Sequence, residues 1–111
     1  MTIEAMSDLG KQIGDRLSAL AERAGEGVPA RWNVTVDFLE DEDDGVRYRW
    51  YSCDVNFEFR PWSPESVDGA EKALRAFKKL CAAEGLEIVD EGGGPTCIGV
   101  TVDVRLPDEP V

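Results

Sequence analysis

Apolar residues recur every three or four positions in two segments of this chain, residues 5–24 and 64–84. This is the spacing of one face of an amphipathic helix, so the sequence predicts two helices. A glycine follows each segment, as is typical just beyond the end of a helix. The apolar positions are Met6, Leu9, Ile13, Leu17, Leu20 and Ala24 in the first segment, and Val67, Ala70, Leu74, Phe77 and Cys81 in the second.

The start of each predicted helix carries candidate caps. Ser7 and Asp8 compete as the N-cap of the first helix. Ser63 is the first candidate for the second helix because Pro64, which follows it, is favoured at the first helical position. Ser66 is the alternative N-cap.

Small residues flank the apolar face of both predicted helices. Glycine inside a helix is unfavourable by up to about 1 kcal/mol relative to alanine, so the glycines of the first helix indicate an unusually close contact. We expect this contact to lie between the two helices, packed side by side. The small residues are Gly10, Gly14, Ser18 and Ala21 in the first helix, and Gly69, Ala73, Ala76 and Ala83 in the second.

Between the helices the hydrophobic period changes to two. Residues 31–39 and 46–59 alternate apolar and polar side chains, which predicts two half-buried strands. Asp44 and Gly45 form a preferred pair for a tight two-residue turn between them. A slip by one residue would send the apolar side chains to both faces, so one register is predicted. Its pairs are Trp32–Phe57, Val34–Val55, Val36–Cys53, Phe38–Tyr51, Glu40–Arg49 and Glu42–Arg47.

Five consecutive carboxylates, residues 40–44, precede Gly45 and raise the question of a calcium-binding loop. An EF-hand loop with Gly45 at its sixth position would have Tyr51 at the twelfth, where a bidentate glutamate is needed. The flanking segments are also predicted strands rather than helices. The acidic run is therefore interpreted as the end of a hairpin and not as a calcium site.

Residues 86–106 predict a second hairpin. Two apolar residues lead into a loop centred on residues 92–95, which read Gly-Gly-Gly-Pro, and alternation resumes after this loop. The predicted cross-strand pairs are Ile88–Ile98 and Leu86–Val100.

The predicted elements follow the order α-β-β-α-β-β in one domain, residues 1–111, with residues 107–111 as a frayed tail. Each strand has one apolar face, so both helices should cover the same face of a four-stranded, mostly antiparallel sheet. The fold class is thus α+β, a two-layer sandwich. Moving the first strand of a ferredoxin-like sandwich to the chain end gives the same order. This permuted ferredoxin-like topology implies sheet order 3-4-2-1, with the longest strands, the second and fourth, in the middle.

Charge narrows the possible partners. The chain has 23 acidic and 12 basic residues, a formal net charge of −11. This balance disfavours nucleic acids and anionic membrane surfaces. A basic protein or a cation is the partner that such a field would attract, and plain solubility is the alternative explanation of the charge.

The cysteines and the first residues of the chain indicate the cellular compartment of the protein. Cys53, Cys81 and Cys97 are widely spaced and odd in number, so they predict packed, reduced thiols rather than a disulfide framework. The first residues lack the pattern of a secretory signal, and no apolar stretch approaches the roughly 18 residues of a membrane span. We therefore expect a cytoplasmic protein.

If both helices cover the apolar face of the sheet, the opposite face is bare. It would be acidic and rich in hydroxyl groups, with aromatic residues at one end. Aromatic residues on a polar face are common anchors for protein contacts, whereas an ordinary solvated face is the alternative. Trp62, between two prolines, is expected to plug the edge of the sheet. The predicted binding residues are Asp37, Tyr48, Trp50, Asp54 and Asp103.

These features favour a non-enzymatic acidic module that binds a basic protein surface, for example an inhibitor or immunity-type protein. No catalytic residue, metal ligand or cofactor is predicted, because histidine is absent and no nucleophile motif is present. The alternative is a domain that binds a small molecule or a cation, acting as a sheet-to-sheet dimer with at most weak catalysis. The partner is accordingly a basic protein or a second copy of the chain.

Overall fold

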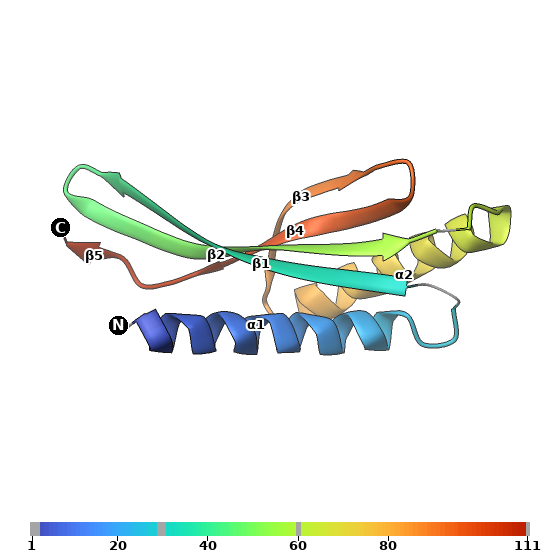
Figure 1. Ribbon diagram of the computed structural model, residues 1–111, viewed down its shortest axis with the longest axis horizontal. Coiled ribbons are helices and arrows are strands. Elements are labelled where there is room, and N and C mark those ends of the chain that lie inside the picture. Colours follow the sequence, from blue (N-terminus) through green and yellow to red (C-terminus); the bar gives the residue numbers. More distant parts are fainter. Residues whose placement is uncertain (1–2, 29–30, 60, 111) are drawn as a thin grey trace.

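The computed structural model describes residues 3–28, 31–59 and 61–110 and confirms the predicted α+β fold. The four main strands pair antiparallel in the order β1-β2-β4-β3, which is the predicted order. Both helices lie on one side of this sheet (Figure 1). The elements are α1 (Ile3–Ala24), β1 (Arg31–Asp43), β2 (Val46–Glu58), α2 (Pro64–Ala83), β3 (Glu87–Gly93), β4 (Cys97–Arg105) and β5 (Glu109–Pro110).

The caps of the two helices were predicted with different success. α1 begins before Ser7 and Asp8, so both lie inside the helix and the prediction that one of them is its N-cap is wrong. In α2, the two candidate serines act together. Ser63 is the N-cap, the Ser66 N–H donates to the Ser63 Oγ at 3.0 Å, and the Ser63 N–H donates to the Ser66 Oγ at 2.9 Å. This reciprocal capping box satisfies two backbone donors at the helix start.

The first hairpin has the predicted register over its whole length. All six predicted pairs are found, and β1 continues through the acidic run to Asp43. Asp44 and Gly45 have φ of 50° and 75°, the two positive values of the expected tight turn. Although Glu42 is the register partner of Arg47, the ion pair of this arginine is diagonal, from its Nε to the Glu40 carboxylate at 3.0 Å. Twisted strands bring such diagonal neighbours within reach of long side chains.

The second hairpin has a different register from the predicted one. Ile88 lies opposite Val102 rather than Ile98, and β3 runs through the glycines to Gly93. An irregularity between Ile88 and Asp90 leaves Val89 as an extra residue, 46% exposed. The predicted register is wrong because the glycines, taken as loop residues, form part of the strand and a bulge absorbs the shift.

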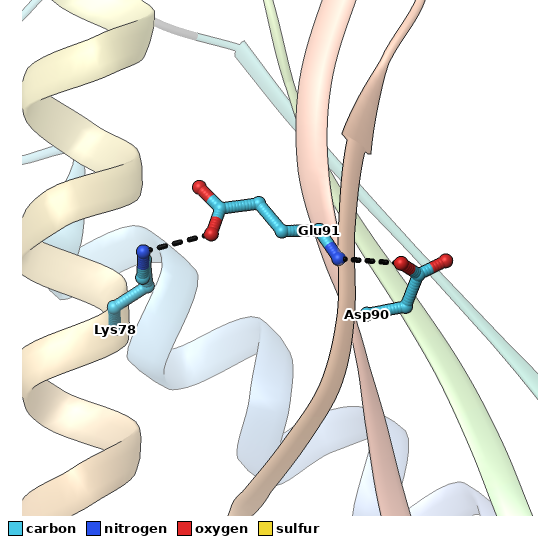
Figure 2. Close-up of polar contacts among 3 residues, drawn as sticks. All are labelled: Lys78, Asp90 and Glu91. Carbon is cyan, nitrogen blue, oxygen red and sulfur yellow. Dashed lines mark hydrogen bonds and ion pairs between the residues drawn. The ribbon is translucent and has the colours of Figure 1, made fainter.

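The bulge decides on which side of the sheet the next two side chains lie. Glu91 points toward the helices and accepts from the Lys78 Nζ on α2 at 2.9 Å, whereas Asp90 points away (Figure 2). The Asp90 carboxylate accepts from the Glu91 N–H at 2.9 Å. An acidic side chain thereby reaches the face of the sheet that the helices leave bare.

The two glycines of α1 approach the sheet closely. A Cβ at Gly10 would lie 3.0 Å from the Tyr51 ring, and one at Gly14 would lie 3.3 Å from the Val36 side chain. The expectation that these glycines bring the two helices together is therefore corrected, although α1 and α2 do contact each other. The close contact is between a helix and two strands.

The core lies under β2 and β4. The inward side chains of β2 from Tyr51 to Phe57 are all buried, as is Phe59 just after the strand, whereas those of β1 are only half-buried or exposed. β2 and β4 are central, as predicted, but the prediction that they are the longest strands is wrong, because β1 has 13 residues, like β2, and β4 has 9. The core residues are Ile13, Leu17, Leu20, Ala21, Ala24, Tyr51, Cys53, Val55, Phe57, Phe59, Ala70, Ala73, Leu74, Phe77, Cys81, Val100, Val102 and Leu106.

Two further predictions concern the chain between the main elements and its end. Trp62 is 72% exposed, so the prediction that it plugs the sheet edge is wrong. In the expected frayed tail, Pro110 lies opposite Val46 and Glu109 opposite Arg47, both on β2. A ladder of two residues is short, so fraying of the tail stays a prediction.

Candidate functional site

The face of the sheet opposite the helices, called here the open face, carries polar residues in rows that cross four strands. Since strand pairing brings residues on the same face together, the register of the sheet defines these rows. Acidic or hydroxyl side chains occupy every position of two adjacent rows. One row is Thr35, Asp54, Thr101 and Asp90, and the other is Asp37, Ser52, Asp103 and Glu87, each from β1 to β3.

Asp54 is held in place by its neighbour on β4. The Thr101 hydroxyl donates to the Asp54 carboxylate at 2.7 Å, and both residues are partly buried. A short hydrogen bond to a carboxylate orients it without neutralising its charge. Asp54 thus presents a fixed negative charge near the centre of the open face.

Asp103 lies in an environment that opposes its ionisation. Partial burial raises the pKa of its carboxyl group, and the nearby carboxylate of Glu87 raises it further, while the Arg105 guanidinium acts in the opposite direction. Glu87 is also the register partner of Asp103, and like charges directly opposite each other are destabilising. A positive group arriving from outside would relieve this repulsion.

The Cys53 thiol, on the other side of the sheet, is affected by the carboxylates of the open face. Its pKa is raised to about 11, first by burial and then by Asp103, Asp54 and Asp37. Asp37, Asp54 and Asp103 lie in adjacent rows of three neighbouring strands, so three of the five predicted binding residues lie close together. The raised pKa also keeps this thiol protonated at neutral pH.

The two predicted aromatic binding residues lie at one end of the open face. Tyr48 and Trp50 line a cavity of about 250 Å³ together with Asp103. Trp50 lies between Leu39 on β1 and Arg105 on β4 in the register of the sheet. The remaining lining residues are Asp41, Arg49, Arg105, Leu106 and Asp108.

The five predicted residues therefore form two overlapping groups. Asp37 and Asp54 belong to the acidic rows, Tyr48 and Trp50 to the cavity, and Asp103 to both. The cavity is smaller than the roughly 300–1,000 Å³ that is usual for small-molecule sites. The open face therefore has the shape of a contact surface more than that of a ligand pocket.

Sequence reasoning missed three acidic residues that belong to this surface. Asp41, like Asp37, occupies an odd-numbered position of β1, so the alternation alone places both on the same face. Asp90 reaches the open face only because of the bulge, and Asp108 lies in the segment taken as a frayed tail. For these two, no local sequence pattern signals their position.

Among residues 3–28, 31–59 and 61–110, no group of three or more acidic or cysteine side chains is placed to hold a metal ion. No helix of this described part of the chain has the length and apolar character needed to cross a membrane. No known protein family, curated protein or solved structure matches this chain significantly.

Proposed function

We propose that this chain is a non-enzymatic binding module whose open face docks a basic surface of another protein. The observation that carries the proposal is the grouping of Asp37, Asp54 and Asp103 on the face of the sheet opposite the buried core residues. An inhibitor or immunity-type role, in which the module covers a basic functional surface of its partner, is the activity that fits this arrangement best.

The balance of charge on the open face supports this partner chemistry. Acidic side chains outnumber basic ones there, and complementary charge raises association rates and excludes partners of the wrong sign. Half-buried carboxylates that already lie close together gain most from a cation, because the repulsion between them is relieved. The acidic residues of the face are Asp37, Asp41, Asp54, Glu58, Glu87, Asp90, Asp103 and Asp108, and the basic ones are Arg31 and Arg105.

The aromatic end of the face would supply the apolar part of the contact. Trp50 and Tyr48 are partly exposed beside Leu39, which is 42% exposed. Tryptophan, tyrosine and arginine are the residues most often found at the energetic centre of protein interfaces. In this proposal Trp50 is the anchor and the carboxylates set orientation and specificity.

A cytoplasmic location belongs to the same proposal. Cys53 and Cys81 are free and buried, and Cys97 is free and partly buried. Free thiols that are packed in a core suit a reducing compartment.

The test is retention of proteins from a native lysate on the immobilised chain at low ionic strength. We expect the triple variant Asp37→Asn/Asp54→Asn/Asp103→Asn, and separately Trp50→Ala, to lose the retained partner. For the partner so identified, affinity should fall at least about tenfold in each variant and should fall with added salt.

The matched control removes the same number of charges from elsewhere on the surface. Glu22, Glu26 and Glu71 are exposed and lie on α1, the loop after it and α2. The triple variant Glu22→Gln/Glu26→Gln/Glu71→Gln changes the net charge equally and should retain the partner. Equal loss in both triple variants, or binding that ignores ionic strength, would contradict the proposal.

A further inference from the structure

The two outer edges of the sheet differ in how they are protected from pairing with another strand. β3, at one edge, is short, bulged and acidic, which are devices that block edge-to-edge association. β1, at the other edge, has 13 residues in unbroken register with β2, and no described segment pairs with its outer side. Its stretch from Trp32 to Leu39 contains no proline or lysine and one charged residue, Asp37.

The inward side chains of this stretch are also incompletely covered. Trp32 has the parity of the core residues yet is 37% exposed, whereas its register partner Phe57 is fully buried. Val34, Val36 and Phe38 are half-buried in the same way. These four apolar side chains thus form a continuous row that the described chain covers only in part. Such a row along an unprotected edge is typical of a contact surface.

A groove runs beside this row, between α1 and β1. Its volume is about 640 Å³, and its floor is formed by Val34, Val36, Phe38 and Tyr51. The glycines of α1 have no side chains that would fill the groove. A larger residue at Gly10 would contact the Tyr51 ring. The other residues of the wall are Ser7, Lys11, Gly14, Asp15 and Ser18.

The backbone of β1 offers hydrogen bonds in a defined pattern. The two-residue turn is closed by the pair Asp43–Val46, and such a turn is flanked by a hydrogen-bonded pair. Because hydrogen-bonded and non-hydrogen-bonded pairs alternate along antiparallel strands, the odd-numbered residues of β1 bond to β2. The N–H and C=O groups of Trp32, Val34, Val36 and Phe38 therefore point outward.

From these observations we infer that β1 pairs antiparallel with β1 of a second copy of this chain, with Thr35 on the two-fold axis. The two four-stranded sheets then join into one continuous sheet with all helices on the same side. The strand is complementary to itself in this register, because aromatic, aliphatic and polar residues each face their own kind. The pairs are Trp32–Phe38, Asn33–Asp37, Val34–Val36 and Thr35–Thr35.

The register also places the exposed indole over the groove. Trp32 of the second copy lies opposite Phe38, which is part of the groove floor. The indole can therefore fill the space that α1 leaves open, and both copies do this at once. A shift by two residues, with Val34 on the axis, would pair Trp32 with Val36 and leave Phe38 without a partner in β1.

Local charge permits this association although the whole chain is strongly acidic. Between Arg31 and Leu39 the strand carries one basic and one acidic residue, and the groove wall carries Lys11 and Asp15. The edge is thus neutral where the copies meet, while the acidic run beyond Leu39 lies outside the paired stretch. The open face remains uncovered, so this dimer is independent of the proposed function and differs from a sheet-to-sheet dimer.

The test is sedimentation together with cysteine cross-linking. At about 100 µM the wild-type chain should sediment as a dimer, and Trp32→Ala should raise the dissociation constant at least about tenfold. In a Cys97→Ser background, Thr35→Cys should form an intermolecular disulfide readily, because a non-hydrogen-bonded pair holds its Cα atoms about 4.5 Å apart.

Two matched cysteine variants in the same background complete the experiment. Val89→Cys, exposed on the opposite edge, should cross-link slowly, and so should Val34→Cys. A wild-type monomer at 100 µM, or equal cross-linking of the Thr35→Cys and Val89→Cys variants, would overturn the inference. Faster cross-linking at Val34 than at Thr35 would overturn the register. Retention of a basic partner would be unaffected by these results, so the two proposals fail separately.

Discussion

The two hairpins of this sheet are both antiparallel, but different features determine the register of each. β1–β2 is long and regular, and it is closed by a two-residue turn with positive φ at both positions. β3–β4 is shorter, contains a bulge and has glycines facing each other at Gly92 and Gly99. Turn chemistry and side-chain pairing determine the first register, whereas the bulge between Ile88 and Asp90 shifts the second.

The two facing glycines of the second hairpin lie in different surroundings, because β4 also approaches β2 closely. A Cβ at Gly99 would collide with the Val55 carbonyl oxygen and with the Asn56 side chain. No such contact exists at its register partner Gly92, where a Cβ would meet open space. The glycine on the central strand is therefore required, and the one on the edge strand is not.

The largest expected effect in this comparison comes from Gly99→Ala. We expect it to lower the free energy of unfolding by about 3 kcal/mol, because the strands must separate to admit the methyl group. Gly92→Ala is the matched control and should change stability by less than about 0.5 kcal/mol. Urea denaturation measures both, and equal effects would show that the two glycines are equivalent.

The next effect contrasts an inner with an outer strand of the second hairpin. Val102 on β4 is fully buried, whereas Val89 at the bulge is 46% exposed. Val102→Ala should destabilise the protein by about 2 kcal/mol, since it removes buried methyl groups and leaves a cavity. Val89→Ala should stay within about 0.5 kcal/mol in the same thermal or urea measurements. A loss at Val89 as large as that at Val102 would mean that the bulge packs against the core.

A smaller effect separates the two turns. Gly45 has a φ of 75° and no atom within 4 Å of an added Cβ, so Gly45→Ala should cost about 1 kcal/mol through backbone strain alone. Gly94, in the turn of the second hairpin, also has free space but no positive φ. Gly94→Ala should be neutral or slightly stabilising in urea denaturation, and a loss equal to that of Gly45→Ala would contradict this difference.

The smallest effects concern charges across the two hairpins. In the first hairpin Glu40 and Arg47 form an exposed ion pair, so Glu40→Gln should cost at most about 0.5 kcal/mol. In the second, Glu87 faces Asp103, whose pKa is raised by burial and by Glu87. The folded chain then binds this proton more tightly than the unfolded chain does. The stability from this group is present below the ordinary carboxyl pKa and is lost as the pH rises through the raised value.

Asp103→Asn should therefore stabilise the protein at pH 7, and the gain over wild type should shrink as the pH is lowered toward about 3. Thermal unfolding of both proteins at several pH values measures this difference. A gain that is independent of pH, or a loss at pH 7, would contradict the electrostatic cause.

Much of the fold could be predicted because it depends on local signals. The alternation of β1 and β2, the Asp44–Gly45 turn and the Ser63 cap each act over a few residues, and all were found as predicted. The second register could not be predicted, because a glycine run is compatible with a loop or with a strand. The exposed Trp62 shows the same limit, since burial depends on what the rest of the chain leaves space for.

The candidate site also has a part that the sequence predicted and a part that depends on tertiary structure. Sequence parity placed Asp37, Asp54 and Asp103 on one face, since successive side chains of a strand point to opposite sides. Their proximity around Cys53 depends on the pairing of three strands, and the groove beside β1 depends on how closely α1 approaches the sheet.

The sequence by itself determined the element order, the first register and the acidic character of one face, because periodicity, turn chemistry and charge are properties of short segments. Only the tertiary structure decided that α1 packs on Tyr51 and Val36, that Asp90 joins the open face and that the β1 edge is left uncovered. These outcomes arise from contacts between distant segments, where the volume and hydrogen bonding of one element set the space left to another.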